Sequence, residues 1–132
     1  NKVIRMVDPD GFATAYEYDE FGENTRITDA EGGQQAFSYT PEGKLLSRTD
    51  ENGNQTGFAY DADLNLSQVT YADGSVTQMA YDAAGNTTVI AEAAGTAIER
   101  QVHRTYDSLN RVLSVEVTGA DGIQIGGLTQ YS

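Results

Sequence analysis

The sequence predicts an all-β fold, an antiparallel meander of repeated β-hairpins, because two regularities run through it. Tyrosines recur every 21 residues, at Tyr18, Tyr39, Tyr60 and Tyr81. Glycines recur with the same period, at Gly11, Gly32, Gly53, Gly74 and Gly95. A period of about 20 to 50 residues is typical of stacked repeat proteins. We therefore expect about five consecutive 21-residue repeats over residues 1–132.

A first turn is expected directly after each tyrosine. Asp follows the tyrosine in most units, as in Tyr18-Asp19, and Thr40 is the exception. Four residues past the tyrosine the chain has Gly22, Gly43, Leu64, Gly85 or Asn110. Glycine and asparagine tolerate a positive φ. An Asp followed three residues later by glycine predicts a β-turn in which the carboxylate accepts a backbone N–H.

A second turn is expected half a period later, and each copy ends in a glycine of the second series. The copies are residues 8–11, 29–32, 50–53, 71–74 and 92–95. Pro9 occupies a turn position to which its fixed φ is suited. Two turns in each unit leave two segments of about six or seven residues, the usual length of a strand.

The segments between the turns have the polarity of strands. In residues 34–39, 54–60 and 75–81, a bulky apolar residue lies two positions before the tyrosine, so the two share a face. The intervening segments, such as 44–49, are rich in Thr, Val, Ile and Leu. No window has a helical period, so we expect about ten or eleven strands joined as hairpins. After Tyr81 the tyrosine spacing lengthens to 25 residues, which predicts a bulge or a longer hairpin.

The charge of the chain argues against several partner classes. It has 8 basic and 20 acidic residues, a formal net charge of −12. Nucleic acids and anionic membranes attract basic surfaces, so neither partner is expected. There is no cysteine for disulfides, and no apolar run approaches the roughly 18 residues of a membrane helix. The chain starts at Asn1 in mid-unit and Tyr131 opens a sixth unit, so we expect a segment of a longer array.

The candidate sites are better explained by turns and strands than by chemistry. Residues 61–65 (Asp-Ala-Asp-Leu-Asn) resemble the start of a calcium loop, but Leu66 and Ala72 stand where such a loop has Gly and Glu. Residues 50–54 are similar, and turn capping explains both. His103 is the only histidine and is expected at an exposed strand position rather than in catalysis. We assign no catalytic, cofactor-binding or metal-binding residue.

The tyrosine series has two interpretations. A tyrosine at one slot of every unit builds a stripe on one face of a sheet, in which each ring packs on its neighbours across strands. Alternatively, the rings form a platform on which carbohydrate stacks. The first interpretation is favoured.

The turn pattern resembles the Rhs or YD repeat, Tyr-Asp-x-x-Gly-x-Leu. Residues 39–45 (Tyr-Thr-Pro-Glu-Gly-Lys-Leu) and 106–112 (Tyr-Asp-Ser-Leu-Asn-Arg-Val) follow it. Residues 50–60 match the preceding half, Asp-x-x-Gly-x-x-x-x-aromatic-x-Tyr. The resemblance covers essentially the whole chain. Departures from the pattern occur at Asn24 in an apolar slot, Thr40 for Asp and Leu64 for Gly.

The resemblance implies a structural role. Rhs and YD proteins include bacterial polymorphic and insecticidal toxins and the animal teneurins, and their repeats form a strip of β-hairpins that spirals into a hollow shell. In the bacterial toxins the shell encloses a C-terminal toxic domain. Some members cleave themselves at an Asp-Pro-x-Gly-Leu motif. Here residues 8–12 read Asp-Pro-Asp-Gly-Phe in an ordinary turn slot, so the protease function is not carried over.

From these observations we expect a structural segment of a shell that encapsulates or presents an associated toxin domain, with no enzyme activity. The expected partners are neighbouring repeats and the enclosed domain, together with self-association through unpaired strand edges. The expected location is secreted or at the cell surface of a bacterium. The alternative is an extracellular binding module that recognises carbohydrate or a protein partner through exposed aromatic rings.

Overall fold

The computed structural model describes residues 2–124 and 129–130, and the regular structure in them is β-strand throughout. Tyr131, the expected start of a further unit, lies outside the described residues. The chain divides into two compact units, Asn1–Gly57 and Phe58–Ser132. The boundary falls within β6 (Gln55–Tyr60). In the described ranges, no helix has the length and apolarity needed to span a membrane.

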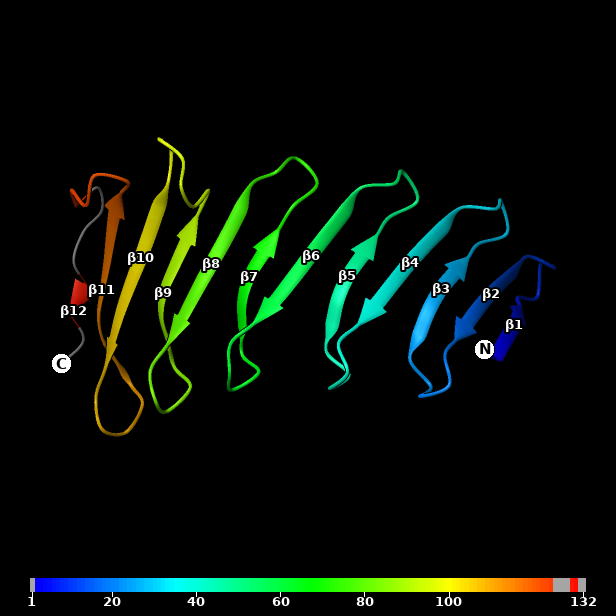
Figure 1. The fold of residues 1–132 in the computed structure, drawn as a ribbon, viewed down its shortest axis with the longest axis horizontal. Helices are drawn as coiled ribbons and strands as arrows, with labels where there is room; N and C mark the ends of the chain where they lie inside the picture. The colour runs from blue at the N-terminus through cyan, green and yellow to red at the C-terminus, as the bar shows by residue number, and fades with distance from the viewer. Residues whose placement is uncertain (1, 125–128, 131–132) are drawn as a thin grey trace. The chain divides into compact units, whose positions relative to one another are not determined.

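Unit 1 is an antiparallel meander in which each strand pairs with the next one along the chain (Figure 1). Its last ladder joins β5 to the start of β6. Its other strands are β1 (Lys2–Val7), β2 (Ala13–Tyr18), β3 (Asn24–Thr28), β4 (Gln34–Tyr39) and β5 (Leu45–Thr49).

Unit 2 follows the same plan, with antiparallel pairing of strands in chain order from β7 to β12. The predicted all-β meander of hairpins is therefore confirmed, and β12 is a strand of only two residues. The strands are β7 (Leu66–Thr70), β8 (Val76–Tyr81), β9 (Thr87–Glu92), β10 (Arg100–Tyr106), β11 (Val112–Gly119) and β12 (Thr129–Gln130).

The hairpin turns share one hydrogen-bond pattern. The N–H of the first turn residue donates to the carbonyl of the fifth, as from Asp82 to Asn86 at 3.0 Å. The N–H of the fourth residue donates to the carbonyl of the first, as from Gly85 to Asp82 at 3.0 Å. Gly85 has a φ of 83°, in the left-handed region. This pattern belongs to the three-residue hairpin loop that ends in a left-handed residue.

Among the described residues, two of these hairpin turns place a residue other than glycine at the left-handed position, and Ala93 in the β9–β10 connection also has a positive φ, of 53°. Asn110 has a φ of 60°, which asparagine adopts at low cost. Leu64 has a φ of 62°, although its Cβ then approaches the following carbonyl. The strain at Leu64 costs on the order of 1 kcal/mol. The surrounding hairpin therefore has enough stability to hold one unsuitable residue in the turn.

The connection between β9 and β10 differs from the other turns. The sequence predicts a turn at residues 92–95 and, in the longer segment after it, a bulge or a longer hairpin. In the structure, β9 continues to Glu92 and β10 starts only at Arg100. The Glu99 carboxylate braces the intervening loop by accepting the N–H of Gly95 at 2.6 Å. The longer hairpin is confirmed: relative to the preceding unit, the connection is two residues longer, and β9 and β10 are each one residue longer than β7 and β8.

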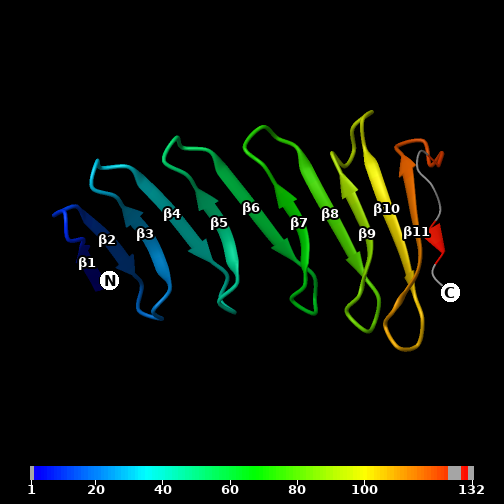
Figure 2. The same cartoon turned by 180° about the vertical axis from the view of Figure 1, so that it is seen from behind.

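Neither unit closes around a hydrophobic core. Figures 1 and 2 view the strands from opposite sides, and no other described element covers either face within a unit. Among the described residues, only Val69, Ala91 and Thr118 are buried, with 8%, 6% and 7% of their surface exposed. In β1, Val3 and Met6 remain 63% and 62% exposed. Strand ladders, turns and cross-strand pairs therefore hold each sheet together.

Asn24 is a polar residue in an unsuitable place. It opens β3 in the slot that Leu45 and Leu66 occupy in the following units. Its Nδ2 and Oδ1 atoms are buried and find no hydrogen-bond partner among the described residues. A buried polar group without a partner loses its hydration and gains nothing in return.

Replacing Asn24 by leucine should stabilise the chain. Asn24→Leu removes the two unpaired polar atoms and restores the apolar residue of the neighbouring units, so we expect a gain of about 1 kcal/mol in the free energy of unfolding. Urea denaturation followed by circular dichroism measures the change. Asn24→Asp, of nearly the same shape but charged, should destabilise the chain. Equal stability of all three proteins would show that the amide is hydrated.

Candidate functional site

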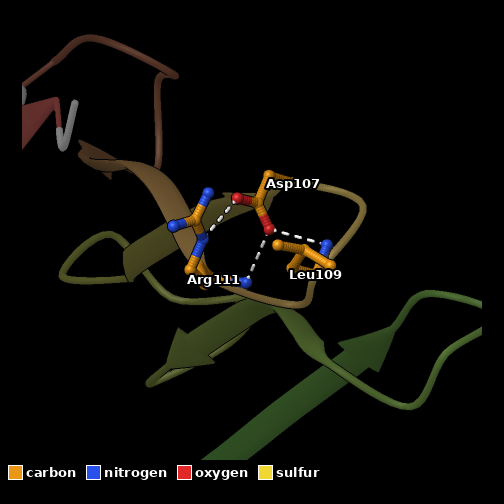
Figure 3. Close-up of polar contacts among 3 residues, drawn as sticks. All are labelled: Asp107, Leu109 and Arg111. Carbon is orange, nitrogen blue, oxygen red and sulfur yellow. Dashed lines mark hydrogen bonds and ion pairs between the residues drawn. The ribbon is translucent and has the colours of Figure 1, made fainter.

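The turn after each tyrosine is organised by the side chain of its first residue. Figure 3 shows this for Asp107, whose carboxylate faces the turn backbone. Its Oδ1 accepts the N–H of Leu109 at 2.8 Å and the N–H of Arg111 at 2.9 Å. Its Oδ2 accepts the Arg111 Nε–H at 2.7 Å. One carboxylate thus fixes the third and fifth residues of the turn.

The same pair of hydrogen bonds, from the third and fifth N–H groups to the first side chain, recurs at both kinds of turn. In five other turns that begin with aspartate, the donor–acceptor distances of these hydrogen bonds are between 2.7 and 3.0 Å. Thr40 replaces the aspartate with a hydroxyl, and both of its bonds lengthen to 3.3 Å. The predicted carboxylate bonds to backbone N–H groups are therefore confirmed. The aspartates concerned are Asp19, Asp29, Asp50, Asp61 and Asp82.

Two turns lack an acceptor side chain at their first position and place an aspartate at the third. In the turn that starts at Tyr71, the Oδ1 of Asp73 accepts the N–H of Ser75 at 2.9 Å. In the turn that starts at Gly119, the Oδ1 of Asp121 accepts the N–H of Ile123 at 2.9 Å. The fifth N–H is bonded to a carboxylate in both arrangements.

These hydrogen bonds favour the ionised carboxylates. Bonds from the residue four positions later lower the pKa values of Asp50, Asp61, Asp82 and Asp107. For Asp50 and Asp82 the largest contribution is the side-chain amide of an asparagine; for Asp61 and Asp107 it is the backbone N–H. The acidic residues of these turns therefore act as acceptors for the backbone.

The structure explains the calcium-like motif in the same way. Asp61 Oδ1 accepts the N–H groups of Asp63 and Asn65, each at 2.9 Å, and its Oδ2 accepts the Asn65 side-chain amide at 3.2 Å. Both carboxylate oxygens of Asp61 are thus engaged within the turn. Among the described residues, no group of three or more His, Cys, Asp or Glu side chains is arranged to hold a metal ion.

The tyrosines of the repeat use their hydroxyls as backbone donors. Tyr39 donates to the carbonyl of Asn24 at 2.8 Å, and Tyr81 donates to the carbonyl of Leu66 at 2.7 Å. Tyr106 makes the same bond, at 2.7 Å, to the carbonyl of Thr87. In each case the acceptor lies at the start of the preceding strand.

The position of these acceptors explains why a tyrosine is needed there. The β3–β4 ladder runs from Thr28↔Gln34 to Arg26↔Ala36, and Asn24 lies beyond its end. The β7–β8 ladder ends in the same way at Gln68↔Gln78, short of Leu66. The tyrosine hydroxyl therefore supplies a donor where the ladder has stopped. Phenylalanine would fill the same space and leave the carbonyl to water.

His103 does not occupy the exposed position expected from the sequence. It lies half-buried in β10, and its Nε2 is 3.5 Å from the hydroxyl of Thr118 on β11. Thr118 is one of the three buried residues of the described chain. The polar pair therefore packs across two strands, and sequence alone could not reveal it because the pairing depends on the β10–β11 register.

Comparisons with known proteins agree with this architecture. The sequence profile of the family described as RHS Repeat matches residues 1–34 and 60–97, more than half of the chain. The chain belongs to the RHS repeat family. An RHS repeat segment of this kind is a structural element, and the predicted resemblance is confirmed. No curated protein matches the sequence.

Solved structures with a similar fold come from toxin complexes. A TcdB2-TccC3-Cdc42 structure matches with a TM-score of 0.71 and 19% identity over 85% of this RHS repeat chain. A structure of TcdB2-TccC3 without its hypervariable C-terminal region matches with a TM-score of 0.69 and 19% identity over 83% of the chain. A Tc holotoxin pore of Photorhabdus luminescens matches with a TM-score of 0.70 and 18% identity over 85% of the chain. The RHS repeat chain spans 6% of the length of each matched chain, so these likenesses describe its fold.

The hydroxyl bond of Tyr81 should contribute measurably to stability. Tyr81→Phe keeps the ring and removes the donor to Leu66, so we expect a loss of about 1 kcal/mol in the free energy of unfolding. Tyr71→Phe is the matched control, because Tyr71 is 43% exposed at a turn. Chemical denaturation of the three proteins measures the difference. Equal losses in both variants would contradict a specific role for the repeat tyrosine.

The turn carboxylates should make the stability of the fold depend on pH. The pKa values of four of them are lowered in the folded chain, so the contribution of these four is complete above the unfolded pKa and is lost as the pH falls through the folded pKa. The melting temperature should therefore stay level near neutral pH and fall below about pH 4. Calorimetry across this range measures the profile. A melting temperature that rises on acidification would contradict this account.

Two aspartates of one turn provide a matched pair of variants that tests whether the carboxylate hydrogen bonds stabilise the turn. Asp61 accepts the turn N–H groups, whereas Asp63 contributes its own N–H to Asp61. At neutral pH, Asp61→Ala should lower the melting temperature by a few degrees, and Asp63→Ala should leave it nearly unchanged. Both variants lose one negative charge, so a difference between them reports the hydrogen bonds and not the charge.

Proposed function

We propose that this chain is a segment of the wall of an RHS shell that encapsulates or presents an associated domain of toxin type. The observation that carries the proposal is a meander of short hairpins without a core of its own, whose tyrosines and aspartates are committed to backbone bonds. Such a strip gains stability from what lies against its faces and edges. Its partners in the proposal are neighbouring repeats and the enclosed domain.

Two further features support a structural role. The turn aspartates of the repeat are acceptors for the backbone, and at Asp61 and Asp82 the pKa is lowered, which is opposite to the shift needed for a general acid. The similar solved structures are of TcdB2-TccC3 complexes and a Tc holotoxin pore. We infer from these neighbours that the whole protein is secreted or displayed by a bacterium and has no enzymatic activity in this segment.

Protection of the associated domain from protease tests the proposal. The experiment uses the full-length protein that contains this segment, with limited proteolysis followed by mass spectrometry. The associated domain should resist digestion in the wild type and become sensitive in Gly85→Val, because Gly85 has a φ of 83° that valine does not tolerate.

Ala84→Val is the matched control for that experiment. It adds the same side chain to the exposed third position of the same turn, where backbone strain is absent. The associated domain should stay protected in this variant. Equal sensitivity of the domain in the wild type and in Gly85→Val would overturn the proposal of a closed wall.

A further inference from the structure

A hollow of about 660 Å³ opens in unit 1 between the turn at residues 19–23 and the turn at residues 40–44. The two turns follow β2 and β4, which run in the same direction in the meander, so both turns lie at the same end of the strands (Figure 1). Rings and carboxylates line the space together. The main contributors are Phe21, Phe37, Tyr39, Pro41, Asp19 and Glu23.

The carboxylates make this hollow strongly negative. Partial desolvation, then the charge of Asp19 and a side-chain hydrogen bond with it, raise the pKa of Glu23. Desolvation, then the charges of Glu23 and Asp19, raise the pKa of the Tyr39 hydroxyl. Glu23 therefore differs from Asp61, Asp82 and Asp107, whose pKa values are lowered. A cation placed beside these groups relieves their mutual repulsion.

The rings of the hollow are placed for contact with a ligand. Phe21 stands at the tip of its turn with 83% of its surface exposed. Phe37 and Tyr39 lie two residues apart in β4, so they share a face of the strand. Aromatic faces attract cations, and a guanidinium group stacks on them particularly well.

In unit 2, one pair of successive turns, residues 82–86 and 107–111, is bridged by side chains. There the side-chain amide of Asn86 donates to Oδ1 of Asn110 at 3.0 Å, which joins the turn after β8 to the turn after β10. Glu23 occupies the same turn position as Asn86, and Gly43 the same position as Asn110. Gly43 has no side chain to meet Glu23, whose Oε1 lies 3.0 Å from where a Cβ of residue 43 would be. The two turns of unit 1 therefore lack the side-chain bridge that joins residues 82–86 to residues 107–111.

We propose that the hollow docks an arginine side chain carried on an extended segment of another polypeptide. Arginine fits because its planar fork donates to two carboxylate oxygens while its face stacks on an aromatic ring. Glu23 and the Oδ2 atom of Asp19 supply the acceptors, since Oδ1 of Asp19 already accepts two turn N–H groups, and Phe21 or Tyr39 supplies the ring. The net charge of −12 would steer a basic segment toward the chain. This inference does not depend on the proposed shell function.

Titration with short blocked peptides tests the inference. The probe is acetyl-Gly-Arg-Gly-amide, followed by two-dimensional NMR of the labelled protein at low salt. Shifts should concentrate at residues 19–23, Phe37, Tyr39 and Gly43. The citrulline peptide, which has the shape of arginine without its charge, should bind at least about tenfold more weakly because its hydrogen bonds are no longer charge-assisted. The lysine peptide should lie between them because it lacks the planar fork.

Variants separate the hollow from the general negative charge. Glu23→Gln should weaken arginine-peptide binding by about tenfold, whereas Glu42→Gln removes one charge from the tip of the neighbouring turn and should have little effect. The double variant Glu23→Asn/Gly43→Asn recreates the Asn86–Asn110 pair and should abolish binding. Asn110 already adopts a positive φ, so asparagine at residue 43 should fold. Circular dichroism checks that each variant keeps its strands.

The results that overturn the inference are equally definite. Shifts spread over the acidic turns of both units would show non-specific attraction to the charge. Equal binding of the arginine and citrulline peptides, or equal losses in Glu23→Gln and Glu42→Gln, would remove the role of the carboxylate pair. Binding of free guanidinium as tightly as the peptide would assign the hollow to a small cation instead of a polypeptide segment.

Discussion

Within each unit the described strands form a sheet of one layer, so no second layer in that unit holds them in register, and this constraint shapes both units. Each hairpin has to fix its own pairing locally, since a slip of one residue moves every side chain to the other face. The turn carboxylates do this by binding the third and fifth N–H groups of the loop, as Asp107 does at 2.8 and 2.9 Å. A left-handed residue, usually glycine, then closes each loop.

The tyrosines solve the complementary problem between hairpins. Where a ladder between neighbouring strands stops, as beyond Arg26↔Ala36, the hydroxyl of Tyr39 reaches back to the carbonyl of Asn24. Turn and tyrosine are adjacent in sequence, so each 21-residue unit carries both devices for extending the sheet. A strip built in this way can be lengthened by adding units, and it leaves its faces uncovered for other contacts. That combination suits a wall or a support better than a catalyst.

Much of this arrangement was predictable from sequence because it is local. Aspartate and glycine three residues apart predicted the turns, and alternation predicted that Phe37 and Tyr39 share a face. Features that depend on register were not predictable. The acceptor of the Tyr81 hydroxyl lies 15 residues away at Leu66, and His103 meets Thr118 only because β10 pairs with β11. The hollow beside Glu23 arises from a side chain that Gly43 lacks, in a turn one unit away.

Amide hydrogen exchange measured by NMR tests the central claim, that the turn side chains hold the register, most directly. The N–H groups of Asn65 and Asn86 donate to carboxylates at 2.9 Å, whereas that of Lys44 donates to the Thr40 hydroxyl at 3.3 Å. The account predicts strong protection for Asn65 and Asn86, despite their position in turns, and faster exchange for Lys44. Exchange of all three at the rate of an open chain, with the strand centres still protected, would contradict it.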